Sequence, residues 1–251
     1  NYWFASNEGL VQYDAKKDQF LEYHPPQILH TKVRSVYVDS DDHVWLATSG
    51  GLNEYNPQSK TLLSYTAKSL KKGYLESNYI SKTVKDKNGD LWVSTLNKGL
   101  YKSTYREGRR DFTPFVLPAI SDIQLNRITE LIIDDHNNLW LDTYDYLLKL
   151  NIASGELTSF TDNTGSSFGV INDSYLFGND LWFATSNGIF KWNENANNFD
   201  KLTDLSINVK GIVADDNFVW ISGYSNIYQF DKVPIMYEWI NTKQCIIYIN
   251  N

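Results

Sequence analysis

One short pattern around tryptophan recurs six times along this chain, and this repetition limits the folds that the chain can adopt. Each Trp is followed by an apolar residue, a third residue and, in five of the six copies, Ser or Thr. The repeated tryptophans are Trp3, Trp45, Trp92, Trp140, Trp182 and Trp220. By subtraction, successive copies lie 42, 47, 48, 42 and 38 residues apart. A period near 40 residues, with β-forming residues in each copy, is typical of β-propeller blades.

Each repeat contains short β-forming runs that alternate with turn residues. The second repeat predicts strands over residues 33–39, 44–48, 52–55 and 61–65, and the third predicts strands over 80–85, 91–95, 100–103 and 112–116. The pair Asn88-Gly89 is a strong hairpin signal, because both residue types adopt positive φ at low cost. The sequence therefore predicts all-β blades of four antiparallel strands, with the Trp side chains buried between blades.

The two ends of the chain predict how the propeller closes. The chain starts at the second strand of a repeat, and residues 245–251 form a β-type run with turn residues that matches the missing first strand. We therefore expect a single domain over residues 1–251, a six-bladed β-propeller of four-stranded blades. Residues 246–249 would pair beside the strand of Trp3, and residues 235–239 would form the last blade's fourth strand. The alternative is an open part of a larger, seven-bladed propeller.

The charge balance and the apolar pattern exclude several classes of function. With 23 Lys and Arg against 30 Asp and Glu, the formal net charge is −7, which argues against nucleic-acid binding. The cluster of Arg106, Arg109 and Arg110 is expected to be a solvated hairpin tip. No run of 18 apolar residues is present, so no membrane contact is expected within this segment. Cys245 is the single cysteine, so no internal disulfide is predicted.

The sequence contains no linear catalytic or metal-binding motif. The four histidines do not have metal-ligand spacing, and no nucleophile elbow or phosphate-binding loop is present. We therefore predict no catalytic residue, no metal and no cofactor. His43 and His136 precede a repeated Trp and are expected to be solvated turn residues. The Asp-rich turns 39–42 and 86–90 are expected to cap tight turns rather than to bind calcium.

Two repeats share a longer pattern. In residues 39–52 and 86–100, a turn rich in Asp precedes Leu or Val, Trp-x-x-Thr and then Gly-Leu. This pattern resembles the two-component regulator propeller repeat, although residues 144–146 replace the Gly in the fourth copy and Gly223 replaces Thr in the sixth. The resemblance implies a periplasmic or extracellular sensor domain of a bacterial hybrid histidine kinase, a class that often responds to oligosaccharides. Any kinase activity would lie outside this segment.

We expect a ligand to bind where the between-blade loops meet the turns that join second to third strands. These loops have unequal lengths, and uneven loops on a regular scaffold commonly carry binding. Aromatic faces combined with Asn, Arg and Asp side chains suit a polar ligand such as a sugar. The candidate contact residues are His30, Arg34, Asn78, Tyr79, Asn97, Lys98, Asn126, Arg127, Tyr144, Asp145, Phe168, Asn187 and Tyr224.

Three functions are compatible with the sequence. The preferred hypothesis is a non-catalytic domain that senses an oligosaccharide or another small polar ligand for a two-component system. The first alternative is a protein-interaction scaffold that forms a homodimer through the sides of the propeller. The second alternative is a lyase or hydrolase acting at the channel mouth, because the fold by itself does not determine function.

Overall fold

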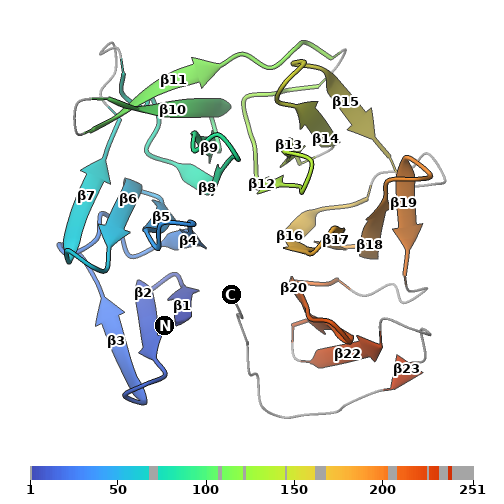
Figure 1. Cartoon of the computed structure of the whole chain (residues 1–251), viewed down its shortest axis with the longest axis horizontal. Coiled ribbons are helices and arrows are strands. Elements are labelled where there is room, and N and C mark those ends of the chain that lie inside the picture. Colours follow the sequence, from blue (N-terminus) through green and yellow to red (C-terminus); the bar gives the residue numbers. More distant parts are fainter. Residues whose placement is uncertain are drawn as a thin grey trace. The chain divides into compact units, whose positions relative to one another are not determined.

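The regular elements of this protein are β-strands throughout the part of the chain that the structure, a computed structural model, describes (Figure 1). The structure describes residues 2–67, 73–106, 109–120, 123–144, 146–161, 168–202, 208–224, 226–231 and 237–238. The strands form six antiparallel sheets, which are the six blades of the predicted β-propeller. Among the described residues, no helix has the length and apolar character needed to cross a bilayer.

The chain forms two compact units, Asn1–Leu131 and Ile132–Asn251. Unit 1 contains blades 1 to 3. Unit 2 contains blades 4 to 6, and the first strand of blade 4 begins just before the boundary. Within each sheet the strands lie in sequence order, so each blade is a simple meander. A single domain over residues 1–251 stays a prediction.

Unit 1 has one three-stranded and two four-stranded sheets. Blade 1 contains β1 (Tyr2–Ala5), β2 (Leu10–Asp14) and β3 (Gln19–Tyr23). Blade 2 contains β4 (Val33–Val38), β5 (Val44–Thr48), β6 (Gly51–Asn56) and β7 (Thr61–Tyr65). Blade 3 contains β8 (Ile80–Lys85), β9 (Leu91–Thr95), β10 (Leu100–Arg106) and β11 (Arg109–Phe115). The strands predicted for blades 2 and 3 are confirmed, except that the last two strands of blade 3 extend further toward their shared turn than predicted. The closing strand predicted at 246–249 lies outside the described residues.

Unit 2 has three four-stranded sheets. Blade 4 contains β12 (Glu130–Ile133), β13 (Asn138–Asp142), β14 (Leu147–Asn151) and β15 (Leu157–Phe160). Blade 5 contains β16 (Ile171–Phe177), β17 (Asp180–Thr185), β18 (Gly188–Asn193) and β19 (Asn198–Lys201). Blade 6 contains β20 (Gly211–Ala214), β21 (Phe218–Ser222), β22 (Ile227–Asp231) and β23 (Tyr237–Glu238). The last of these lies within the fourth strand predicted at 235–239.

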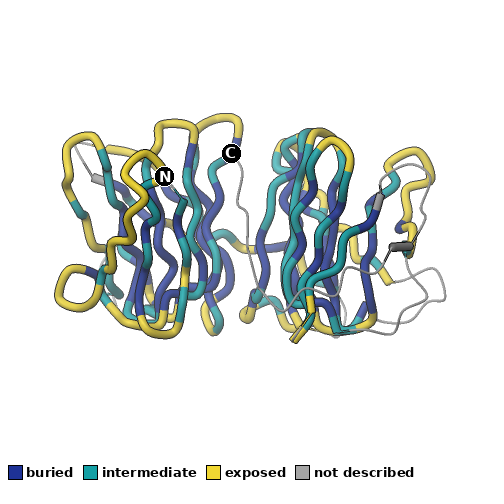
Figure 2. The backbone as a smooth tube through the Cα atoms, turned by 90° about the horizontal axis from the view of Figure 1, so that it is seen from below, coloured by how far each residue is buried: buried dark blue, intermediate teal, exposed yellow. Residues whose placement is uncertain are grey.

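Burial decreases from the second strand of a blade to its outer strand (Figure 2). Every residue of β5, β9 and β13 is buried, whereas β3 is exposed along most of its length. The repeated Trp lies on these second strands. Trp45, Trp92 and Trp140 are almost completely buried, and Trp220 in blade 6 is half-buried. A buried indole removes a large apolar area from water, which stabilises the packing around it.

A carboxylate in the preceding turn binds the indole N–H of the repeated Trp in three blades. The pairs, with their Nε1–Oδ2 distances, are Trp45 with Asp39 at 3.0 Å, Trp92 with Asp86 at 2.9 Å, and Trp140 with Asp134 at 2.9 Å. The second oxygen of each Asp accepts backbone N–H groups of its own turn. The turn-capping role predicted for the Asp-rich turns is confirmed. The same side chain also satisfies a buried donor, which costs about 1–3 kcal/mol when it is left unpaired.

Blade 5 is built without this carboxylate. The turn between β16 and β17 contains only Gly178 and Asn179, because Phe177 already pairs with Asp180. Within the described residues, Trp182 Nε1 is buried and has no hydrogen-bond partner. The shorter turn therefore leaves one indole donor unsatisfied.

The hydroxyl three residues after the Trp closes the turn into the third strand. Thr48 Oγ1 donates to the Gly51 carbonyl at 2.7 Å, and Thr95 Oγ1 donates to the Gly99 carbonyl at 3.0 Å. Both glycines have positive φ, 133° and 69°, which glycine adopts without a steric cost. In blade 4, Tyr144 has a φ of 80°, a strained value for a residue with a Cβ.

The indole–carboxylate pair predicts that Trp92→Phe destabilises the protein more than Trp182→Phe. Both substitutions remove similar apolar area, but Trp92→Phe also deprives the buried Asp86 oxygen of its donor, whereas Trp182→Phe removes a donor that has no partner. We expect the free energy of unfolding to fall by about 1–3 kcal/mol more for Trp92→Phe. Chemical denaturation followed by circular dichroism measures the difference, and equal losses would contradict the anchoring role.

Candidate ligand-binding face

Within each unit, the between-blade loops lie beside the turns that join second to third strands. In unit 1, the Ser49 backbone N–H donates to the Lys32 carbonyl at 3.2 Å. In unit 2, the Ser186 N–H donates to the Val170 carbonyl at 2.9 Å. The predicted meeting of loops and turns is therefore confirmed within each unit, and this end of a unit is termed its loop end.

The loop end of unit 1 exposes most of the side chains predicted there as ligand contacts. The exposed residues are His30, Tyr79, Asn97, Lys98, Asn126 and Arg127. Asn78 instead supports the loop, because its Oδ1 accepts the Ala67 N–H at 2.6 Å. Asn97 Oδ1 also accepts the Ser77 hydroxyl at 2.5 Å, which orients the amide. The structure thus places the predicted residues on one end of unit 1, with Asn78 in a structural position.

Arg34 differs from these residues, because its guanidinium is partly buried. It lies at a β-bulge near the start of β4, where the register with β5 shifts between Val33 and Ser35. Burial lowers the pKa of Arg34 from its ordinary value, and nearby Tyr79 acts in the opposite direction. Among the described residues, Arg34 Nε is buried and donates to no acceptor, which is also true of Arg110 Nε. A buried cationic donor of this kind is uncommon in proteins.

Bulges occur at the same strand position in blades 3 and 5, around Ser81 and Asn172. There the side chain reaches the next blade. Ser81 Oγ donates to the Ile128 carbonyl at 2.7 Å, and Asn172 Nδ2 donates to the Val209 carbonyl at 2.7 Å. A short polar side chain at this position therefore links neighbouring blades.

Unit 2 has a polar cluster at its loop end around Lys210. Lys210 Nζ donates to Asn172 Oδ1 at 3.3 Å, and Asn172 Nδ2 donates to Asn208 Oδ1 at 3.0 Å. The ammonium group also lies 4.7 Å from the ring centroid of Tyr224, which is 82% exposed. Asp173 accepts the Ile212 N–H at 3.1 Å beside this cluster. The arrangement offers hydrogen-bonding groups next to an exposed aromatic face.

The predictions for unit 2 included Tyr224 but missed Asn172 and Lys210. Both residues lie ten positions before the Trp of their blade, whereas Arg34 lies eleven before Trp45. An alignment of the repeats on Trp that allowed for the shorter turns of blades 5 and 6 would have grouped them with Arg34.

The other predicted contacts of unit 2 have different environments. Tyr144 is 47% exposed and Asn187 is exposed. Phe168 is only 3% exposed and packs against Phe190 and Phe199, with ring centroids 4.9 and 4.8 Å away, so it belongs to the core. The predicted contact Asp145 lies outside the described residues.

Sequence analysis also missed two charged residues on the first strands of blades 3 and 4. Lys82 Nζ lies 3.0 Å from Glu130 Oε1, and the Glu130 side chain is 5% exposed. Each neutralises the other, so this pair links the two strands without adding net charge to the loop end of unit 1.

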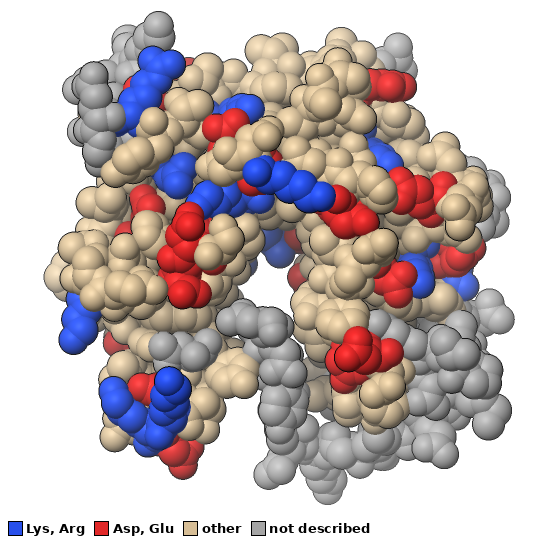
Figure 3. Space-filling view, in the orientation of Figure 1, with Lys and Arg blue, Asp and Glu red and all other residues tan. Residues whose placement is uncertain are grey.

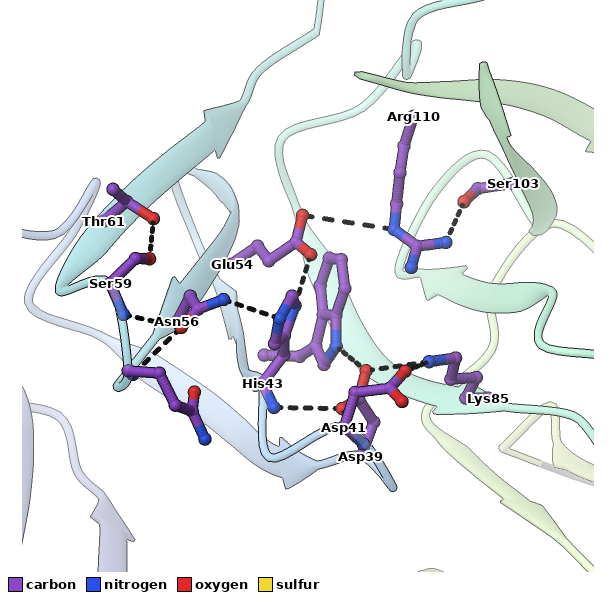
Figure 4. A network of polar contacts seen from close by, with 12 residues as sticks. Asp39, Asp41, His43, Glu54, Asn56, Ser59, Thr61, Lys85, Ser103 and Arg110 are labelled. Atoms are coloured by element: carbon purple, nitrogen blue, oxygen red, sulfur yellow. Dashed lines mark hydrogen bonds and ion pairs between the residues drawn. The ribbon is translucent and has the colours of Figure 1, made fainter. Parts of the chain in front are cut away.

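A buried charged network joins blades 2 and 3 at the opposite end of the strands (Figure 4). Arg110 on β11 is 8% exposed, and its Nε lies 4.0 Å from Glu54 Oε2. Its guanidinium carbon lies 4.8 Å from the Trp45 ring centroid. The expectation that Arg110 is part of a solvated hairpin tip is therefore wrong, because the long β10–β11 hairpin brings this residue over the Trp of blade 2. Arg106 is exposed, as expected.

His43 belongs to the same network and is not a simple solvated turn residue, which corrects the sequence-based expectation. Asn56 Nδ2 lies 2.9 Å from His43 Nε2, and His43 Nδ1 lies 2.8 Å from Glu54 Oε1. Because the amide nitrogen can only donate, Nε2 accepts and Nδ1 carries the proton that is donated to Glu54. Tyr65 also donates to Glu54, at 2.6 Å. These partners occupy Glu54, so its carboxylate is structural.

Asp39 connects this network to Lys85. Lys85 Nζ lies 3.3 Å from Asp39 Oδ2 and also contacts Asp41. Burial by itself would raise the pKa of Asp39, but the Trp45 indole, the backbone amides of the turn and Lys85 outweigh it, and the pKa lies below its ordinary value. The ionised carboxylate is therefore the form that stabilises the fold.

Among the residues that the structure describes, one group of side chains has a separation compatible with a metal ion. Asp134, Asp135 and His136 place potential ligand atoms within 4.8 Å of one another. Asp134 is already engaged, because its Oδ2 accepts Trp140 Nε1 and its Oδ1 accepts two backbone N–H groups. His136 is 52% exposed, as expected for a turn, and pairs with Asp135 at 2.8 Å. Asp134 therefore caps the turn, and this role explains why the three side chains lie close together.

Charges are interspersed over the surface shown in Figure 3, where basic and acidic side chains lie next to one another. Such a surface lacks the broad basic area that phosphate backbones require, in keeping with the formal charge of −7.

The family model for the two-component regulator propeller matches residues 27–50 and 74–97. The matched segments contain the loop and first two strands of blades 2 and 3. These two segments are two-component regulator propeller repeats. The predicted resemblance is thereby confirmed, on the same repeats that carried it.

Two proteins that are described as signalling proteins are similar to this propeller. It is 26% identical over 196 residues to histidine kinase P4 of Formosa agariphila, which covers 70% of this chain and 14% of the relative. It is also similar to the extracellular domain of a protein described as a hybrid two-component system from B. thetaiotaomicron, with a TM-score of 0.78 and 20% identity. That match covers 97% of this chain and 35% of the other. The propeller therefore spans a small part of the length of these relatives.

The same fold occurs in an enzyme. Virginiamycin B lyase from Staphylococcus aureus matches with a TM-score of 0.68 and 17% identity, over 96% of this chain and 81% of the lyase. A similarity at this level of identity shows the fold alone. Enzymatic activity depends on which residues line the active site, and the fold does not determine these.

The lowered pKa of Asp39 predicts a change in acid stability for Asp39→Asn. A carboxyl group whose pKa is depressed in the folded state contributes stability above its unfolded pKa, and this contribution is lost as the pH falls through the folded pKa. The wild-type protein should therefore lose more stability than Asp39→Asn as the pH falls below about 4. Urea denaturation at several pH values measures this slope, and parallel curves would contradict the assignment.

The Arg110 network predicts that Arg110→Met is strongly destabilising, because Glu54 would be left buried without a cation. We expect a loss of about 3–5 kcal/mol in the free energy of unfolding. Combining Arg110→Met with Glu54→Gln should cost less than the sum of the two single changes. Arg106→Met on the same hairpin is the matched control, and a loss as large as that of Arg110→Met would contradict the network.

Proposed function

We propose that this propeller is a non-catalytic ligand-sensing domain of a two-component signalling protein, and that the loop end of unit 2 binds an oligosaccharide or another small polar ligand. The proposal is supported by the regulator propeller repeats and by the similarity to an extracellular domain of a hybrid two-component system. A periplasmic or extracellular location follows from the same similarity and is part of the proposal.

The observation that carries this proposal is the cluster around Lys210 and Tyr224. A sugar presents an apolar ring face and several hydroxyl groups, so it needs an aromatic surface with donors and acceptors beside it. Tyr224 supplies the exposed ring, while Lys210, Asn172 and Asn208 supply the polar groups. The side-chain contacts among the three polar residues fix their positions before a ligand arrives, which reduces the entropy lost on binding.

A non-catalytic role is favoured by the way the buried carboxylates are used. Glu54, Asp39 and Glu130 each have a cation or several donors as partners. A general acid or base needs a carboxylate that can reach the substrate and change protonation state. These three carboxylates instead support contacts between strands and blades.

Homodimer formation through the sides of the propeller is the second candidate. The outer strand β3 exposes Phe20 at 66% and Leu21 at 48%, and β7 exposes Leu63 at 46%. Exposed apolar side chains on edge strands favour association. Sedimentation equilibrium of wild type and of Phe20→Ser with Leu21→Ser tests this, since a dimer that buries about 1,000 Å² or more should dissociate in the double variant. A wild-type monomer at all concentrations would exclude it.

Binding at the loop end predicts that Tyr224→Ala and Lys210→Ala weaken saccharide binding. We expect each to reduce affinity about 10-fold, because one contributes a ring face and the other a charged hydrogen bond. Isothermal titration calorimetry against an oligosaccharide identified on a glycan array measures this. Tyr105→Ala is the matched control, since Tyr105 is 63% exposed near the opposite end of β10. Unchanged affinity in both loop-end variants would contradict the proposed site.

A further inference from the structure

The turn between β9 and β10 in blade 3 is one residue longer than its counterparts. In blades 1, 2, 4 and 5, the hydroxyl three residues after the repeated Trp donates to the carbonyl of the residue three positions further on. In blade 3, Thr95 Oγ1 instead donates to Gly99, four positions further on. The longer turn exposes two polar side chains, Asn97 and Lys98, at the loop end of unit 1. A longer turn on an otherwise regular repeat is a common place for a binding function.

Backbone hydrogen bonds hold this turn on both sides. On one side, the Leu96 N–H donates to the Tyr79 carbonyl at 3.0 Å. On the other side, the Gly99 N–H donates to the Asn126 carbonyl at 2.7 Å. The turn is therefore fixed between the two between-blade loops that flank blade 3, and its exposed side chains are presented by a backbone that is already ordered.

A buried hydroxyl orients the amide of Asn97. Ser77 is only 3% exposed, and its Oγ donates to Asn97 Oδ1 at 2.5 Å and accepts the Tyr79 N–H at 3.0 Å. Because Oδ1 accepts this bond, the Nδ2 group of Asn97 is directed away from Ser77. Within the described residues, Asn97 Nδ2 has no hydrogen-bond partner, and neither has the ammonium group of Lys98. Both side chains are exposed, so these donors are open to a ligand.

Tyr79 supplies an aromatic ring beside these donors. Its side chain is 52% exposed, while its backbone is held at both polar groups, by Ser77 and by Leu96. The Tyr79 N–H and the Asn97 amide oxygen bind the same Ser77 hydroxyl, which places the two residues side by side. An exposed ring next to oriented hydrogen-bond donors is the combination that a sugar residue requires, because a sugar has an apolar face and several oxygen atoms.

We propose that the loop end of unit 1 contains a second saccharide-binding site, centred on the β9–β10 turn. Tyr79 stacks against the sugar ring, and Asn97 and Lys98 donate hydrogen bonds to its oxygen atoms. This site goes beyond the proposed function, which assigns a ligand to the loop end of unit 2, and it shares only the ligand class. Because the turn is ordered before the ligand arrives, little conformational entropy is lost on binding. The chain therefore binds two saccharide molecules, one on each unit.

Nuclear magnetic resonance of the full, isotope-labelled chain follows the two sites separately. The probes are four tetrasaccharides, built from glucose, mannose, galactose and N-acetylglucosamine, and the oligosaccharide selected on the glycan array. The amide signals of Asn97 and Lys98 report on unit 1, and those of Asn208 and Lys210 report on unit 2. At least one probe should shift the signals of Asn97 and Lys98 in a saturable way. The signal of Asn88, in the turn at the other end of β9, should not move.

Two variants separate recognition from folding. Asn97→Asp keeps an oxygen that accepts the Ser77 hydroxyl but loses the amide donors, so it should fold normally and bind about 10-fold more weakly at unit 1. Tyr79→Ala should weaken binding by a similar factor, because the ring face is lost. In both variants the signals of unit 2 should respond as in wild type. Tyr105→Ala is the matched control for the loss of an exposed ring, since Tyr105 is 63% exposed near the opposite end of β10.

Each outcome of this experiment decides between the two sites. Shifts confined to Asn208 and Lys210, or unchanged affinity in both Asn97→Asp and Tyr79→Ala, would overturn the second site and leave the proposed function intact. Shifts confined to Asn97 and Lys98 would support the second site and contradict the placement of a ligand on unit 2. If no probe shifted either set of signals, both proposals would be overturned.

Discussion

The fold depends on how the indole N–H of a buried tryptophan is satisfied. In blades 2 to 4 the repeated Trp lies on the almost completely buried second strand, and its N–H cannot reach water. In three blades an Asp six residues earlier in the sequence accepts a hydrogen bond from this N–H. Its other oxygen accepts hydrogen bonds from the backbone amides of the turn. One carboxylate thus connects the first strand, the turn and the core. The spacing between Asp and Trp must match the turn, which explains why these repeats share a turn of the same length.

Much of the architecture could be predicted from the sequence for this reason. The Trp period, the Asp-rich turns and the glycine turns lie within single repeats, so local pattern was sufficient to locate the strands of blades 2 and 3. The error at Arg110 has a different origin. Its environment depends on a long β10–β11 hairpin that reaches Trp45 in the neighbouring blade. A cluster of arginines in the sequence has the same appearance whether water or an aromatic ring lies beside it.

The loop end of each unit could be predicted as a location, but its individual residues could not. Exposed residues such as Tyr79 and Lys98 lie where the loop pattern suggested. Asn78 and Phe168 have the composition expected for a binding surface, yet one closes a loop and the other packs in the core. Asn172 and Lys210 were missed because a polar residue in a strand, or directly before one, gives no sign of what it faces. Their roles follow from a bulge and from the neighbouring blade, which no single repeat encodes.

At the turn end of unit 1, charged side chains are buried together. Asp39, Glu54 and Arg110 have partners within the protein, so removing one of them exposes the cost of burying the others. Two arginines of this unit nevertheless keep a buried Nε without a hydrogen-bond acceptor among the described residues, Arg110 at the turn end and Arg34 at the loop end. A donor in this state weakens the fold, because its desolvation is not offset by a hydrogen bond. A buried donor without an acceptor therefore does not by itself distinguish a residue that holds the blades together from one that contacts a ligand.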